Sequence, residues 1–438
     1  MSTMFQSLGN RSYRLWAGGS LISNIGTWMQ RMAQDWLVLT VLTDHSGTAL
    51  GVTTGLQFLP VLFLGPYAGV LADRNSKRSI LLWTQTAMGF CALAVGLLVV
   101  TGAAQLWNIY AAALCLGLAS AIDGPTRQAF VSELVDNDQI ANAVSLNSAS
   151  FNIASLAGPA LAGLLILWIG TGPVFLLNAA SFAAVLVSLG RIRGADLIPF
   201  IPAARRGPQV AEGLSYVRGR PDLALILITV GVVGAFGLNF PITNALMVTS
   251  EFRLGPGELG VLSSLLAVGT LAGALLSARR ATPRFRYLVV GATGLGTFTL
   301  IASISPAFWV YAVVLVPVGL SAMTFLNVCN TSIQLSVSPQ LRGRVLALYL
   351  AVLQGGTALG APLMGWIGTE FGARWALVTS GSAVVVTGVL TLIIICRRSP
   401  LTLRTQFRNI LTKGPNPADC AKNHVSSTSG VDLPAEVS

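Results

Sequence analysis

Four charged side chains interrupt apolar stretches of this 438-residue chain, and they come in two pairs. Arg31 and Asp35 are four residues apart, as are Asp123 and Arg127. At this spacing on a helix, the acid and the base of each pair share one face and partly neutralise each other. A charge at the centre of a bilayer costs about 2.5–3.5 kcal/mol or more, so buried charges are expensive to keep. The chemistry open to these pairs is the binding and release of protons by the carboxyl groups of Asp35 and Asp123.

Asp35, with Arg31 beside it, is the candidate we favour for proton coupling. We expect it in the outer part of its segment, where it can face a central cavity. Burial there favours the protonated carboxyl, whereas Arg31 favours the carboxylate. These opposing effects suit a group that binds a proton and then releases it. The alternative is that Asp35 and Arg31 form a structural ion pair.

Residues for enzyme chemistry are scarce. The two histidines, His45 and His424, have no partners for a catalytic triad or a metal site, and the sequence contains no GxxxxGK[ST] loop for ATP. Five cysteines stand at spacings that fit neither a CxxC metal site nor a disulfide framework, so we interpret them as packing residues. We therefore expect no catalytic residue, no metal and no cofactor. Any work that the protein performs would draw on a gradient.

The elements that position these charges are predicted to be membrane-spanning helices. The chain is 53% apolar and only 10% charged, whereas a soluble domain carries about 25% charged residues, so a soluble globular enzyme is excluded. A span needs about 20 mostly apolar residues, and twelve segments qualify. They are 13–40, 49–71, 79–101, 106–130, 141–167, 172–190, 222–248, 257–278, 285–305, 307–333, 343–368 and 373–397.

Two polar stretches divide the chain. Residues 191–221 are rich in Arg, Pro and Gly, and we expect them to form a central loop between an N-terminal half, 1–190, and a C-terminal half, 222–397. Residues 398–438 have the composition of a disordered tail. The first residues lack a compact apolar core followed by a small-residue cleavage site, so we expect the first hydrophobic segment to be retained.

The basic residues predict the orientation of the chain. If the N-terminus is cytoplasmic, 23 of the 27 Lys and Arg residues fall in cytoplasmic loops and termini, and Arg253 and Arg374 fall outside. This distribution satisfies the positive-inside rule with both termini in the cytoplasm. The net charge of +11 therefore reports orientation in a membrane, and nucleic-acid binding loses its support.

The two halves repeat one another weakly. At an offset of 203 residues, the stretch that ends at Pro159 falls on the stretch that ends at Pro362. At an offset of 204 residues, the stretch 69–73 falls on the stretch 273–277. Two related six-helix halves are typical of transporters that rock one half against the other around a midplane site.

The turn after the second segment carries a motif. It reads Gly69-Val-Leu-Ala-Asp73-Arg74-Asn-Ser76-Lys77-Arg78 and resembles the G-x-L-A-D-R-x-G-R-K loop of the major facilitator superfamily, departing from it at Ser76 and Lys77. The resemblance implies an all-α membrane protein with twelve transmembrane helices in two pseudo-symmetric six-helix bundles. We expect Gly69 to permit close helix contact. The expected cytoplasmic latch consists of Gly69, Asp73, Arg74, Lys77, Arg78, Asp123 and Arg127. The alternatives are a charged turn that only obeys the positive-inside rule, and an Asp123 that only pairs with Arg127.

Within this superfamily, the chain is similar to the branch that holds the enterobactin exporter and macrolide-type efflux pumps. The similarity rests on residues 123–131, 146–152 and 28–37, and it covers the chain from about residue 10 to residue 397. It implies export of a small molecule driven by the proton gradient, and it leaves the cargo open.

The fifth segment carries a second motif. Gly158, Pro159 and Gly163 resemble the G-x-x-x-G-P-x-x-G-G signature of antiporters in the superfamily, with alanine in place of two glycines. Small residues four apart let helices approach closely, and Pro159 bends the helix. Ordinary tight packing is the alternative, because a similar pattern surrounds Pro362 in the eleventh segment.

The superfamily's substrate cavity is lined by helices 1, 4, 7 and 10, and three of these segments carry neutral amides and aromatic rings. Such groups suit an uncharged or amphiphilic cargo, but amides also hold helices together and aromatic rings often face lipid. The cavity candidates are Asn24, Trp28, Gln34, Asn239, Phe240, Asn244, Asn327 and Asn330.

Taken together, these features predict proton-coupled efflux of a small molecule such as a drug or siderophore. We expect the transporter to function as a monomer in the inner membrane of the cell. The alternatives are an importer or uniporter of a small solute, and a receptor or assembly protein that keeps the fold without transport.

Overall fold

The computed structural model describes residues 3–194, 197–198, 209–278 and 285–398. Over these ranges the regular structure is entirely helical, without a β-strand. Residues up to Val389 form one compact unit, and from Leu390 onward the structure describes only the last turns of one helix. The predicted disordered tail lies outside the described residues after Arg398.

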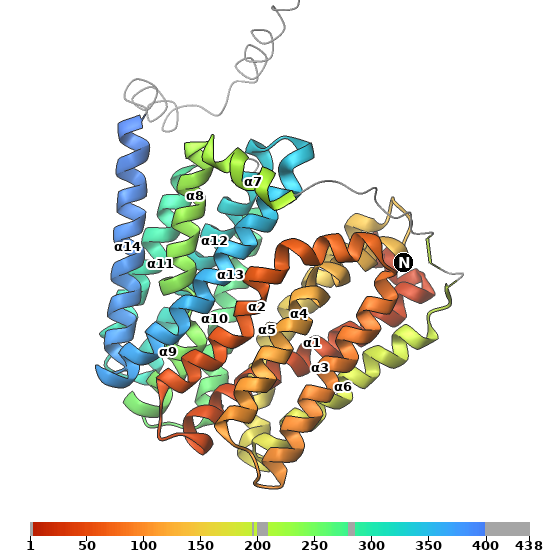
Figure 1. Cartoon of the computed structure of the whole chain (residues 1–438). Helices are drawn as coiled ribbons and strands as arrows, with labels where there is room; N and C mark the ends of the chain where they lie inside the picture. The colour runs from red at the N-terminus through yellow and green to blue at the C-terminus, as the bar shows by residue number, and fades with distance from the viewer. Residues whose placement is uncertain (1–2, 195–196, 199–208, 279–284, 399–438) are drawn as a thin grey trace, which may run out of the picture. The chain divides into compact units, whose positions relative to one another are not determined.

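Each of the twelve predicted segments falls on a helical stretch (Figure 1). The first six stretches are α1 (Arg11–Leu37) with η2 (Val38–Leu42), α2 (Gly47–Arg74), α3 (Lys77–Val100), α4 (Leu106–Leu134), α5 (Ile140–Ile169) and α6 (Thr171–Arg191). The seventh is a broken rod of α8 (Pro221–Val232), η4 (Val233–Gly237), α9 (Phe240–Leu246) and η5 (Met247–Glu251). The rest are α10 (Pro256–Ala278), α11 (Phe285–Ser303), α12 (Phe308–Ser336), α13 (Pro339–Glu370) and α14 (Ala373–Arg398).

Two short helices were not predicted. η1 (Thr3–Gly9) precedes α1 and packs on α5, while α7 (Gln209–Arg218) lies in the expected central loop and packs on α13. Glu212 of α7 forms an ion pair with Arg344 near the start of α13. A short helix therefore precedes the first long helix of each half and docks on the fifth long helix of that half.

Polar side chains mark where several helices begin. Ser46 accepts a hydrogen bond from the Ala49 amide at 3.2 Å and begins α2, and Ser76 accepts one from the Ser79 amide at 3.4 Å and begins α3. Such N-caps satisfy backbone amides that have no partner within the helix. α5 ends at Gly170, whose φ of +79° suits glycine.

Ten of the described helical stretches are long and apolar enough to cross a membrane. α1 has the length to cross but carries Arg31, Asp35 and several amides and serines, which lower its hydropathy. The described apolar part of α11, Tyr287–Ser303, is shorter than the other spans. The chain is therefore a multi-pass membrane protein, because unpaired backbone amides in lipid would be costly and long helices avoid them.

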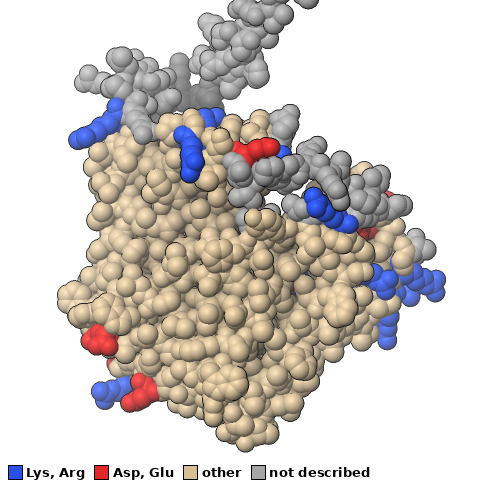
Figure 2. All heavy atoms as spheres, viewed as in Figure 1, with Lys and Arg blue, Asp and Glu red and all other residues tan. Residues whose placement is uncertain are grey.

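Charged residues gather near the helix ends. Figure 2 shows most of the Lys and Arg residues in view along the top and the right-hand side, with acidic residues among them, and acids with a base at the lower left. We call the side that holds the start of α1, the α2–α3 turn and the end of α6 the basic end. The other side, which holds η2 and η5, is called the π-helix end because both of these segments are π-helices.

The two halves contact each other through α2 with α13 and α5 with α10. Glycines permit both contacts. A Cβ on Gly55 of α2 would lie 2.9 Å from the carbonyl oxygen of Ala358 on α13, and one on Gly260 of α10 would lie 2.7 Å from the carbonyl oxygen of Pro159 on α5. These backbones therefore approach more closely than any larger residue would allow.

Candidate functional site

The guanidinium of Arg31 lies among aromatic rings. Its central carbon is 5.1 Å from the ring centroid of Trp28 on α1 and 6.0 Å from that of Phe58 on α2. Trp28 in turn meets the Phe151 ring of α5 edge-on at 5.7 Å. Within the described residues, the buried Arg31 Nε has no hydrogen-bond partner. The cation thus lies against ring faces from α1 and α2, an attraction that strengthens where water is excluded, and α5 supports one of these rings through Phe151.

Asp35 lies one helical turn beyond Arg31 and is half-buried. Among the described side chains, no salt bridge and no hydrogen bond engages its carboxylate. The two charges of Asp35 and Arg31 attract each other across one helical turn without forming a salt bridge. A half-buried carboxyl without a fixed partner remains available for a proton or a ligand.

Asp123 is tied to α3 as well as to its own helix. Its Oδ1 accepts hydrogen bonds from Thr84 Oγ1 at 2.8 Å and Gln85 Nε2 at 2.7 Å, and its Oδ2 lies 3.1 Å from Arg127 Nε. The carbon of the Arg127 guanidinium lies 5.4 Å from the ring centroid of Trp16 on α1. This cluster joins α1, α3 and α4, so Asp123 matches the alternative of a pair with Arg127 and gains two further partners.

Lys77 is the basic residue of the α2–α3 turn that is buried. Its Nζ lies 2.6 Å from Glu133 Oε1, and the two side chains are 8% and 11% exposed. Glu133 is not among the sequence candidates, because the fourth segment was predicted to end at residue 130. α4 continues to Leu134, which places Glu133 in the last helical turn.

The other members of the expected latch lie in different environments. Arg78 donates to the carbonyls of Leu189 at 3.0 Å and Gly190 at 3.4 Å, which belong to the last turn of α6 and have no helical partner of their own. Arg74 is exposed, and the side chain of Asp73 lies outside the described part of the chain. The expected role of Gly69 is wrong for this structure, because a Cβ there would meet no atom within 4 Å.

The glycines of the α5 motif serve two interfaces. A Cβ on Gly158 would lie 2.5 Å from Trp28 Cβ on α1, and one on Gly163 would lie 2.7 Å from the carbonyl oxygen of Pro256 on α10. The motif therefore holds α5 against its own half and against the other half. This agrees with close packing, and it puts the motif at a contact that joins the halves.

The predicted cavity amides fall into buried and partly exposed groups. Asn244 Oδ1 accepts a hydrogen bond from Tyr311 Oη at 2.7 Å, and Asn239 Nδ2 donates to the Ala235 carbonyl at 2.6 Å. These buried amides hold the seventh stretch together and join it to α12, so they match the alternative of helix contacts. Gln34 and Phe240 are also buried, whereas the partly exposed candidates are Asn24, Trp28, Asn327 and Asn330.

One buried amide pair is not among the residues predicted from the sequence. Asn178 Nδ2 of α6 lies 2.5 Å from Gln30 Oε1 of α1, and Asn178 Oδ1 accepts from Ser181 Oγ at 2.8 Å. Both amides lie inside apolar segments, which is the signal that could have identified them. In lipid, such hydrogen bonds contribute to helix association.

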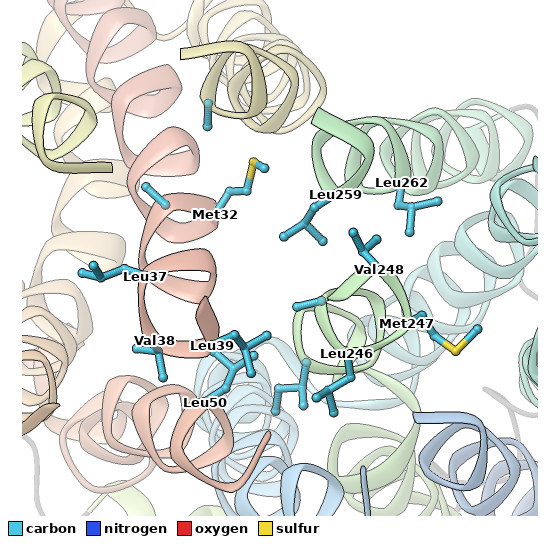
Figure 3. Close-up of a cluster of buried hydrophobic side chains, with 14 of the residues drawn as sticks. Met32, Leu37, Val38, Leu39, Leu50, Leu246, Met247, Val248, Leu259 and Leu262 are labelled. Carbon is cyan, nitrogen blue, oxygen red and sulfur yellow. The ribbon is translucent and has the colours of Figure 1, made fainter. Parts of the chain in front are cut away.

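Apolar side chains fill the π-helix end between the two halves. Figure 3 shows Met32 of α1 and Leu259 of α10 facing the space between these helices, with Leu39 of η2 beside Leu50 of α2. Leu39, Leu50 and Val248 of η5 are fully buried. We call this cluster the apolar plug.

Comparison with known proteins identifies the family. Residues 2–406 match the profile of the family described as transmembrane secretion effector. The chain belongs to this family of major facilitator transporters. The predicted superfamily is thereby confirmed, and the protein is a transporter and not an enzyme.

The transporter is similar to curated bacterial proteins along most of its length. It is 27% identical over 390 residues to the MFS-type transporter YfiS of Bacillus subtilis, covering 85% of this chain and 90% of the relative. It is 24% identical to macrolide efflux protein A of Streptococcus pyogenes, covering 86% and 94%. It is also 24% identical to the enterobactin exporter EntS of Shigella boydii, covering 82% and 85%. These relatives agree with the predicted branch.

Solved structures share the fold. The nucleoside transporter NupG matches with a TM-score of 0.71 at 13% identity, covering 87% of this chain and 99% of that one. A bacterial homologue of the lysosomal transporter Spinster matches with a TM-score of 0.70 at 17% identity, covering 88% and 96%.

Proposed function

We propose that the transporter exports a small molecule, such as a drug or siderophore, in exchange for protons. The relatives supply the direction, because two of them are named as a macrolide efflux protein and an enterobactin exporter. The observation that carries the coupling is the half-buried Asp35, which has no fixed partner among the described residues and lies one turn from Arg31. A carboxyl in this setting can bind a proton when the cavity faces one side and release it when the cavity faces the other.

We further propose twelve spans in two six-helix bundles, 1–190 and 222–397, joined by the central loop. The ten apolar stretches support this count when α1 and α11 are added to them. The basic end would face the cytoplasm, with both termini there, since most of the Lys and Arg residues that the structure describes lie on that side. The transporter would act as a monomer in the inner membrane.

A cytoplasmic latch would then lie at the basic end. Its proposed members are Asp73, Lys77 and Arg78, with Glu133 added as the buried partner of Lys77. Asp123 and Arg127 would support the latch by holding α3 against α4 and α1.

The coupling proposal predicts the behaviour of Asp35→Asn in proteoliposomes. With an imposed pH gradient and a panel that includes a macrolide and a catecholate siderophore, the native protein should move protons against one of these solutes. Asp35→Asn should abolish the proton movement, because an amide cannot carry the proton, while exchange of labelled for unlabelled solute continues. Internal pH dye and radiolabel report the two processes separately.

Asp44→Asn is the matched control, because Asp44 is an exposed acid at the same end of the molecule. It should leave proton movement unchanged. Proton coupling that persists in Asp35→Asn at normal protein levels would refute the assigned role. Failure of the native protein to exchange any solute would favour the receptor alternative, and exchange without proton movement would favour a uniporter.

A further inference from the structure

We propose that a pocket at the π-helix end binds a small organic anion, with an anionic oxygen group next to an apolar body. The pocket has a volume of about 500 Å³. Trp36, Thr40 and His45 line it from the first half of the chain. Thr249, Ser250, Arg253 and Leu254 line it from the second half.

The two sides of the pocket are formed by similar turns, which differ in that His45 donates its closing hydrogen bond itself whereas the residue after Arg253 donates the other. His45 and Arg253 are the two non-glycine residues with positive φ in the described chain, and both have a φ of +54°. Each follows a π-helix, and each turn is closed by an amide that bonds to a carbonyl six residues earlier. These bonds are His45 N to Leu39 O and Leu254 N to Val248 O, both 2.9 Å long. Non-glycine residues seldom adopt this conformation. Its occurrence in both halves therefore indicates that the surrounding structure imposes it on each turn.

The charge of the pocket is positive. No acidic side chain lines it, and in the described structure no salt bridge engages Arg253. The nearest acid in the sequence, Glu251, is paired with Arg374 at 2.7 Å. Arg374 is itself held by the Ser303 and Ser305 carbonyls at 3.0 Å each. Glu251 is thus drawn toward α14, and the Arg253 guanidinium is left to meet an anion from outside.

The remaining lining groups define the body of the ligand. Trp36 and Leu254 offer an apolar wall. The hydroxyls of Thr40 and Thr249 donate to the carbonyls of Trp36 and Ala245, at 2.8 Å each, so their oxygens are left as acceptors. An aromatic acid with a hydroxyl group would match the base, the apolar wall and the acceptors of this pocket. Its carboxylate would meet Arg253, its ring would lie against Trp36, and its hydroxyl would donate to a threonine oxygen.

The pocket is separated from the interior by the apolar plug. Leu39 and Val248 are fully buried in the plug, and Thr40 and Thr249 come directly after them in the chain. A ligand in the pocket would therefore reach it from the π-helix end. That this end faces outward rests on the proposed orientation, whereas binding itself does not.

Equilibrium dialysis of the purified full chain in neutral detergent tests the proposal with radiolabelled salicylate as the probe. Binding should saturate, and uncharged salicylamide should not compete. Arg253→Gln should weaken binding about tenfold or more, because a charge-assisted hydrogen bond is lost, while Arg253→Lys retains part of the affinity. Arg193→Gln, which removes an exposed base at the basic end, is the control and should bind like the native protein.

Added phosphatidylglycerol identifies the source of the anion. Competition that depends on Arg253 would show that a lipid headgroup also occupies the anion site, and its absence would restrict the site to free organic anions. Equal binding in Arg253→Gln, equal binding of salicylamide, or no saturable binding would each overturn the proposal. Salicylate binding is measured without a pH gradient and without transport, so failure of proton coupling and failure of this site are distinguishable.

Discussion

At the scale of single residues, the buried charges are held in three different ways. Lys77 is paired with a carboxylate from another helix, Asp123 accepts from three side chains, and Arg31 lies against aromatic rings. Asp35 differs from all of them, because no bond in the described residues engages its carboxylate. Because charge inside a membrane is expensive, Asp35 stands out as a charged residue without a hydrogen-bond or salt-bridge partner among the described side chains.

The pair of Lys77 and Glu133 predicts a measurable contribution to stability. Glu133→Gln should lower the free energy of unfolding by about 3 kcal/mol, because the Lys77 ammonium loses a buried counter-charge. Urea titration in detergent, followed by tryptophan fluorescence, measures the change.

Two controls interpret that result. The double variant Lys77→Met with Glu133→Leu should recover much of the loss, since it removes both buried charges together. Asp222→Asn breaks the largely exposed pair with Arg220 and should cost less than about 1 kcal/mol. A loss for Glu133→Gln no greater than that for Asp222→Asn would contradict the prediction.

At the scale of helices, glycine identity matters only where backbones meet. The halves touch along α5 with α10 and along α2 with α13, and glycines occur on both sides of each contact. Gly69, by contrast, belongs to the motif that carried the family resemblance and yet faces open space. Motif membership and packing are thus separate properties of a glycine.

Alanine substitutions at Gly163 and Gly69 should therefore have opposite effects. Gly163→Ala places a methyl group 2.7 Å from the Pro256 carbonyl oxygen, which forces α5 and α10 apart and should destabilise the protein by about 1–3 kcal/mol. Gly69→Ala adds a helix-favouring residue in open space and should be neutral or stabilising by up to about 1 kcal/mol. Thermal unfolding of both variants in the same detergent measures the two changes in stability. Equal losses of stability would show that the close approach at Gly163 is not the cause of the destabilisation.

At the scale of the whole molecule, the described halves are joined at the π-helix end by the apolar plug and by close helix contacts. A transporter that works by alternating access must open these contacts in another state. The structure therefore represents a conformation in which the π-helix end is packed.

A disulfide across α2 and α13 should stop transport by holding this conformation. In a cysteine-free background, Thr48→Cys with Thr369→Cys should crosslink on mild oxidation, because the side-chain oxygens of these residues on α2 and α13 lie 3.4 Å apart. Solute exchange should fall to background and return on reduction. A pair within one half, Cys91 and Cys115 of α3 and α4 restored to that background, is the matched control and should leave exchange intact, because these two side chains already contact each other. Undiminished exchange after complete α2–α13 crosslinking would refute a rocking motion of the halves.

Local properties of the chain were enough to predict the helical stretches, the gathering of bases at one end and the family. Hydropathy, helical spacing and loop charge depend on neighbours in the sequence, so the twelve segments could be placed within a few residues. The predicted end of α4, residue 130, lies four residues before its end in the structure, and Glu133 was therefore not considered as a candidate.

The partners of the buried groups were decided only by the tertiary structure. Which face of α3 meets α4 determines that Asp123 binds Thr84 and Gln85, and the approach of two distant turns creates the pocket of His45 and Arg253. The physical reason is that hydrophobicity determines which stretches enter the membrane but contributes little to the choice of which helix packs against each helix face. That choice is made by backbone approach at glycines and by hydrogen bonds between helices, which depend on residues far apart in the sequence.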